Sequence, residues 1–144
     1  MNNGERAAEL LNSGLNCCQS VLIVFGESYG LSPEMAKRVA RAFGGGMGHL
    51  GKTCGAVTAG MMVLGLASDR EDEAEAKKVS YSRVQELFKH FEALHGTTDC
   101  RILLGADVST EDGYKQAKEN ELFSKVCPAF VKDAAAILEK LLAS

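Results

Sequence analysis

The chain contains no tryptophan, and aromatic residues make up only 6% of its 144 residues. Its formal net charge of −3 at pH 7 leaves no excess of positive charge. Nucleic-acid-binding proteins usually carry a basic surface, and those that bind single strands stack the bases on aromatic side chains. These two shortages argue against a nucleic-acid partner.

Long hydrophobic runs are also missing. The longest, residues 54–67, includes glycine and threonine, whereas a membrane-spanning helix requires about 20 apolar residues. Residues 1–6 lack the basic-then-apolar order of a secretory signal. We therefore expect a cytoplasmic protein without a membrane partner.

The five cysteines contain no C-x-x-C pair of the kind that forms zinc knuckles, and no C-x-x-C-H haem-attachment motif. A permanent disulfide framework is not expected in the reducing cytosol. Metal binding, catalysis and simple burial are the three roles left for these thiols.

The hydrophobic periodicity is helical almost throughout, with only two prolines in the chain. Asn16 has the position of an N-cap, and Ser32-Pro33-Glu34 is a strong helix-start signal. Residues 21–25 alone fit a buried strand equally well, but the preceding cap favours a helix. Residues 69–95 predict one long helix with Leu94 in its buried stripe, and Thr110 caps another predicted helix to about Lys125. The pattern as a whole predicts an all-α, single-domain bundle of about six to seven helices over residues 1–144.

Four of the five cysteines fall at predicted helix starts, where free N–H groups and the helix dipole favour a thiolate. The four follow a predicted cap or precede a helix-starting proline: Cys17 after Asn16, Cys54 after Thr53, Cys100 after Asp99, and Cys127 before Pro128. Brought together by the fold, four thiolates would suit iron or zinc. Scattered burial of cysteines in the core is the competing interpretation. Cys18 lies about 100° around the helix from Cys17 and is the expected bystander.

Residues 46–51 match G-x-G-x-x-G literally, but a predicted helix precedes them instead of the strand that dinucleotide binding requires. A tight crossing loop, or a loop wrapped around a cofactor, fits this context better. His49 is a candidate ligand or a solvated loop residue. His90 and His95 are expected on a helix surface.

Several segments in this order resemble the C_GCAxxG_C_C family of redox-active proteins over nearly the whole chain. The resemblance implies a cysteine-based redox or metal role for Cys17, Cys54, Cys100 and Cys127, and a related region of split-Soret cytochromes is associated with an iron–sulfur cluster. The name-giving segment is placed at residues 46–51, where Met47-Gly48 replaces Cys-Ala. The segments that carry the resemblance are residues 16–22, 43–48, 54–60, 99–105 and 127–128.

The leading prediction is a redox or electron-transfer protein in which these four cysteines bind an iron–sulfur cluster, with zinc as the alternative metal. A metal-free thiol–disulfide oxidoreductase and a non-catalytic helical interaction protein with buried cysteines are the competing hypotheses. Whether the chain is an enzyme stays open at this point. An unidentified redox partner protein is expected, and a homodimer is an open alternative.

Overall fold

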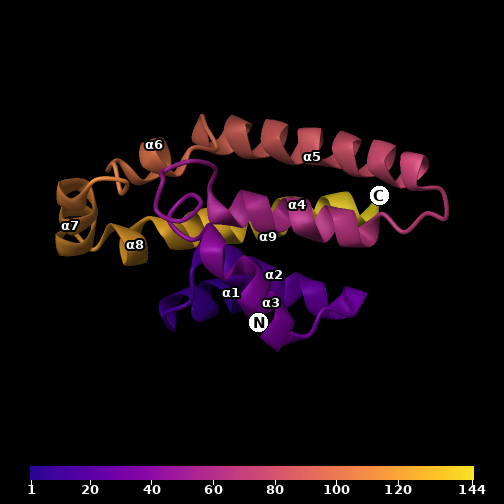
Figure 1. Ribbon diagram of the computed structural model, residues 1–144, viewed down its shortest axis with the longest axis horizontal. Coiled ribbons are helices and arrows are strands. Elements are labelled where there is room, and N and C mark those ends of the chain that lie inside the picture. Colours follow the sequence, from indigo (N-terminus) through magenta and orange to yellow (C-terminus); the bar gives the residue numbers. More distant parts are fainter.

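Helix-start and helix-stop signals divide the chain into nine α-helices and two short 3₁₀ turns, and no β-strand forms (Figure 1). The computed structural model describes residues 1–144. The α-helices are α1 (Asn3–Asn12), α2 (Cys17–Gly26), α3 (Pro33–Ala40), α4 (Gly55–Ala67), α5 (Glu73–His95), α6 (Cys100–Leu104), α7 (Glu111–Glu119), α8 (Leu122–Lys125) and α9 (Cys127–Ala143). The all-α prediction is confirmed.

The helices outnumber the predicted six to seven because the sequence pattern hides a break. The predicted helix over residues 110–125 divides into α7 and α8, since Glu121 adopts a left-handed conformation with φ of 55°. A left-handed residue cannot continue a right-handed helix. The short helices α6 and α8 thus act as connectors between the longer ones.

The N-cap of α2 is confirmed in detail. The Asn16 side chain accepts a hydrogen bond from the Gln19 N–H at 2.9 Å, and the Gln19 side chain accepts one from the Asn16 N–H at 3.0 Å. This reciprocal capping box satisfies two backbone donors that the first turn would leave free. The apolar run after it is accordingly helical, and the alternative of a strand is excluded.

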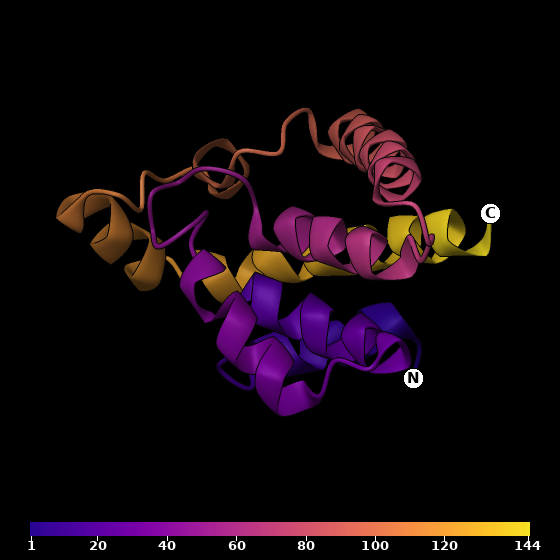
Figure 2. The same ribbon diagram turned by 45° about the vertical axis from the view of Figure 1, so that its right-hand side comes forward.

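The helices lie in three layers (Figures 1 and 2). Helix α5 forms one outer layer, α4 and α9 form the middle layer, and α1 to α3 form the other outer layer. Helix α4 packs against α2, α5 and α9, and a helix that is apolar all round is stable only when it is covered on most sides. None of the helices combines the length and the hydropathy that a bilayer span requires.

Two expectations for the end of α5 are wrong. Leu94, placed in the buried stripe by its spacing, is 61% exposed because the last turn of α5 directs it to solvent. His95, expected on the surface, is half-buried. Its Nε2 lies 2.8 Å from Asp133 Oδ2 on α9, and its ring meets the Phe130 ring edge-on at 4.9 Å. This pair fastens the end of α5 to α9.

Replacing Phe91 with alanine tests this contact between α5 and α9. Phe91 is fully buried and lies 6.3 Å from the Phe130 ring centroid. We expect Phe91→Ala to lower the free energy of unfolding by about 3–5 kcal/mol, the usual cost of a large core cavity. Urea denaturation measures this value. Tyr81→Ala on the same helix is the control, because Tyr81 is 61% exposed; a similar loss there would contradict the assignment of the core.

Candidate functional site

The four cysteines from predicted helix starts line one cavity of about 610 Å³. They belong to four different helices: three are the first residues of α2, α6 and α9, and Cys54 is the N-cap of α4. The fold therefore brings together residues that lie up to 110 positions apart, from Cys17 to Cys127. All five cysteines of the chain are free thiols.

Gly55 allows the starts of α2 and α4 to meet. A Cβ atom at this position would lie 2.9 Å from the Cys18 backbone nitrogen and 3.2 Å from the Cys17 Cβ. Contacts below 3.0 Å with backbone are not tolerated without a shift. The missing side chain of Gly55 therefore places Cys17 against Cys54.

A short backbone ladder brings Cys100 to the same place. Thr53 and Asp99 form an isolated antiparallel bridge. The Cys54 N–H donates to the Thr98 carbonyl at 2.7 Å, and the Cys100 N–H donates to the Lys52 carbonyl at 2.6 Å. The ladder joins the end of the glycine loop, residues 44–51, to the start of α6. Cys54 and Cys100, which lie beside the ladder, are therefore held close together.

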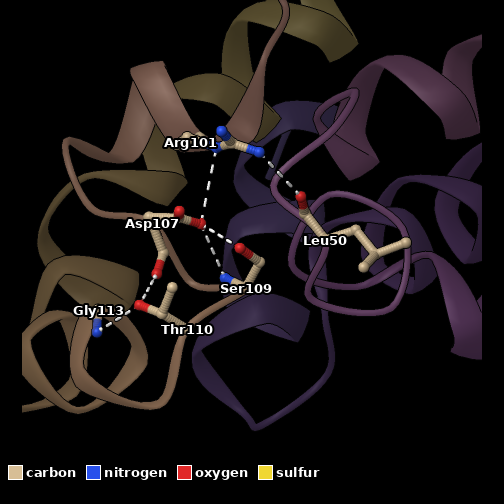
Figure 3. Close-up of polar contacts among 6 residues, drawn as sticks. All are labelled: Leu50, Arg101, Asp107, Ser109, Thr110 and Gly113. Carbon is tan, nitrogen blue, oxygen red and sulfur yellow. Dashed lines mark hydrogen bonds and ion pairs between the residues drawn. The ribbon is translucent and has the colours of Figure 1, made fainter.

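Arg101 continues this junction on the outside of the molecule (Figure 3). Its guanidinium lies 3.4 Å from the Leu50 carbonyl of the glycine loop and 3.6 Å from Asp107 Oδ1. Asp107 also accepts a hydrogen bond from the Ser109 N–H. The loop, α6 and the segment that leads into α7 are thus fastened to one another around the cavity.

The thiol of Cys17 interacts with those of Cys127 and Cys54. Hydrogen bonding to Cys127 and then to Cys54, followed by burial, raises the pKa of Cys17 well above its ordinary value. The pKa of Cys54 is lowered, first by the hydrogen bond from Cys17 and then by the backbone N–H groups of Ala56 and Val57. Of this pair, Cys54 therefore ionises more readily than Cys17.

The expectation of a thiolate at every helix start is wrong for two positions. Burial is the main cause that raises the pKa of Cys100 to about 12, and the charges of Cys54 and Cys127 raise it further. At Cys17, neighbouring thiols and burial likewise outweigh the helix dipole. Burial, together with hydrogen bonding and repulsion among the thiols, exceeds the effect of a single helix end at these two positions.

Cys18 and Met47 lie outside the cavity lining. Cys18 is fully buried, and the Thr58 hydroxyl lies 3.6 Å from its Sγ in a hydrogen bond. Burial raises the pKa of Cys18 to about 11. Met47 is 37% exposed in a left-handed conformation. The side chain at position 47, where the resemblance places the cysteine of the family name, is therefore not part of the cavity lining.

The remaining predicted candidates separate into two groups. His49 lines the cavity and stacks on Tyr114 with ring centroids 4.9 Å apart, whereas His90 and His95 do not line it.

Sequence reasoning missed Arg41, Tyr114 and Phe123, which also line the cavity, because no short motif marks them. No three His, Cys, Asp or Glu side chains stand in an arrangement ready for a single metal ion.

Comparison with known proteins gives one match. Residues 15–141 match the family described as "Putative redox-active protein (C_GCAxxG_C_C)". The matched range contains all four cysteines of the cavity. No curated protein matches the chain, and neither does any solved structure.

Adding one methyl group to α4 tests the contact between α2 and α4. We expect Gly55→Ala to lower the free energy of unfolding by about 1–3 kcal/mol, as overpacking in a dense interior does. Gly65→Ala in the same helix is the matched control, because a Cβ there meets no atom within 4 Å. It should stabilise the protein by about 0.5–1 kcal/mol through the higher helix propensity of alanine. Chemical denaturation distinguishes the two, and equal effects would refute the close approach.

The pH dependence of thiolate formation tests the role of Cys17. In the reduced protein, Cys54 should ionise at the lowest pH, because its pKa is lowered by the hydrogen bond from Cys17. Cys17→Ala removes this donor, so the first step of the ultraviolet thiolate titration should move to higher pH. Cys18→Ser, which alters a thiol outside the cavity, should leave that step in place. A first step unchanged in Cys17→Ala would show that Cys17 does not stabilise the Cys54 thiolate.

Proposed function

Because the chain belongs to the C_GCAxxG_C_C family of redox-active proteins, we propose that it is an electron-transfer protein whose four cysteines hold an iron–sulfur cluster. The observation that carries the proposal is the convergence of Cys17, Cys54, Cys100 and Cys127, from four helix starts, on one cavity. A scattered set of core cysteines would not share a lining.

The donor set fits such a group. Among the residues that line the cavity there is no aspartate or glutamate. The thiols are accompanied mainly by apolar and glycine residues, and also by Asn12, Asn16, Arg41, His49 and Ser124. Sets of cysteine thiolates select iron–sulfur clusters or zinc over harder cations, which prefer oxygen. No three His, Cys, Asp or Glu side chains are arranged for a single ion, which favours a multi-iron cluster over zinc.

Helix N-termini compensate the negative charge of the ligands. In the protein without metal, the thiols reduce this charge by staying protonated, as the raised pKa values of Cys17 and Cys100 indicate. Binding of a cation displaces these protons. The start of α4 already lowers the pKa of Cys54, which favours its thiolate as a ligand.

A bound cluster would supply one-electron transfer at a potential set by its surroundings. An electron carrier needs a second protein to exchange electrons with, and we propose such a redox partner without identifying it. The five free thiols also suit the reducing cytoplasm, where disulfides rarely persist. We therefore propose this compartment as the location of the protein.

A second candidate function is supported by the contact between Cys17 and Cys54. A neutral thiol that donates to a thiolate is the arrangement from which a dithiol oxidises to a disulfide. The protein would then act as a metal-free thiol–disulfide oxidoreductase, with Cys54 as the attacking sulfur. The thiols of Cys127 and Cys100 beside this pair are not required by such a reaction, so the cluster explains more of the site.

Anaerobic reconstitution with ferrous iron and sulfide tests the proposal. We expect visible charge-transfer absorption and a stoichiometric iron content after removal of unbound metal. Cys17→Ser, Cys54→Ser, Cys100→Ser and Cys127→Ser should each reduce the iron content or change the spectrum, since each removes one thiolate ligand. Cys18→Ser is the matched control, because this neighbouring thiol does not line the cavity.

Colourless protein without iron after careful reconstitution would contradict the cluster. If that protein instead shows a reversible two-electron couple and a mass-mapped disulfide between Cys17 and Cys54, the second candidate function is the correct one. Equal loss of iron in Cys18→Ser and in the four cavity variants would contradict the assignment of the ligands.

A further inference from the structure

The cavity is larger than its cysteines require. Of the 23 residues that line it, only four are cysteines. The others include an arginine, most of the glycine loop and a wall of aromatic rings. A volume of about 610 Å³ falls within the usual range of small-molecule sites, roughly 300–1,000 Å³. Room for a second molecule therefore exists beside the thiols.

Arg41 is the only Lys, Arg, Asp or Glu residue in this lining. Its guanidinium takes part in none of the ion pairs of the structure. Its only hydrogen bond outside the helical backbone is made by its carbonyl, which accepts from the Asn16 side chain at 3.1 Å. A guanidinium offers five N–H donors in a planar fork that matches a carboxylate or a phosphate. An exposed cation without an ion-pair partner therefore stands among the residues that line the cavity.

The glycine loop adds free backbone donors next to it. The N–H groups of Met47, His49 and Leu50, and those of the two residues that follow, each donate to a backbone carbonyl. The three successive N–H groups of residues 44–46 have no such acceptor, although these residues line the cavity and Gly46 is buried. Buried backbone N–H groups are rarely left without a partner, and consecutive free N–H groups form anion-binding concavities.

An aromatic wall supplies the apolar part of the lining. The His49 and Tyr114 rings lie 4.9 Å apart with an angle of 32°, and the Tyr114 and Phe123 rings lie 5.9 Å apart. All three line the cavity. Rings of this kind bury large apolar areas and stack on planar ligands. The wall therefore suits an apolar or aromatic body better than a bare inorganic anion.

We propose that the cavity binds a small carboxylate or phosphate ester with an apolar or aromatic body, its anionic group held by Arg41 and the N–H groups of residues 44–46. The inference rests on the proposed function only in placing the ligand beside the thiols of the redox site. The binding itself is a property of the cavity.

Titration of the full chain with three probes tests the proposal. Phenyl phosphate and benzoate carry the two anionic groups on the same ring, and benzyl alcohol is the neutral control. At constant ionic strength, we expect saturable shifts of the amide NMR signals of residues 44–46 with at least one of the anions and none with benzyl alcohol. Binding of only one anion identifies the phosphate or the carboxylate class. Absence of binding by both anions, or equal binding of the alcohol, would overturn the proposal.

Arg41→Gln should weaken the binding of the anion about tenfold or more, as expected for the loss of charge-assisted hydrogen bonds. Arg38→Gln is the matched control, because Arg38 is an exposed cation nearby on α3 that does not line the cavity. Equal weakening in both variants would show a general charge effect and overturn the assignment to Arg41. If Arg41→Gln does not fold, titration of the unmodified chain with the three probes still tests whether the cavity binds an anion.

The titration is read separately from the iron content. Iron bound by the cysteines without anion binding contradicts only the present inference. Anion binding in a chain that takes up no iron contradicts only the cluster. The anionic ligand would then belong to the site of the thiol–disulfide oxidoreductase.

Discussion

The site depends on one close approach, that of the start of α2 to the start of α4. Only a glycine at position 55 permits it, because a Cβ there would lie 2.9 Å from the backbone of Cys18. The contact places Cys17 against Cys54, and the bridge between Thr53 and Asp99 brings α6 to the same point. The apolar helix α4, packed against α2, α5 and α9, provides the rigid support on which these starts meet.

The same convergence creates an electrostatic conflict that protonation relieves. Burial and mutual repulsion oppose several thiolates in one cavity, whereas free N–H groups at helix starts favour each of them. The outcome differs between sites: the pKa of Cys54 is lowered, and that of Cys100 is raised to about 12. Under the proposed function, binding of a metal by the thiols would remove this repulsion.

The glycine loop has two roles at once. Its carbonyls and several of its N–H groups close the loop and join it to α6, with Cys100 donating to Lys52. The N–H groups of residues 44–46, which line the cavity, have no backbone acceptor. The loop matches a dinucleotide-binding motif in sequence but not in structural context. The 3₁₀ turn Arg41–Phe43 precedes it, whereas the motif requires a preceding β-strand. The meaning of its glycines is therefore set by the neighbouring elements.

The sequence by itself determined the helical class, the N-cap at Asn16 and the position of four cysteines at helix starts, because periodicity and caps are local properties. It missed the break at Glu121 and the burial of His95, since these depend on what packs against the helix. Only the tertiary structure decided that the four thiols share a cavity and that Arg41 joins them. Convergence across the chain, and the pKa values that follow from it, arise from contacts between distant segments, which no local pattern records.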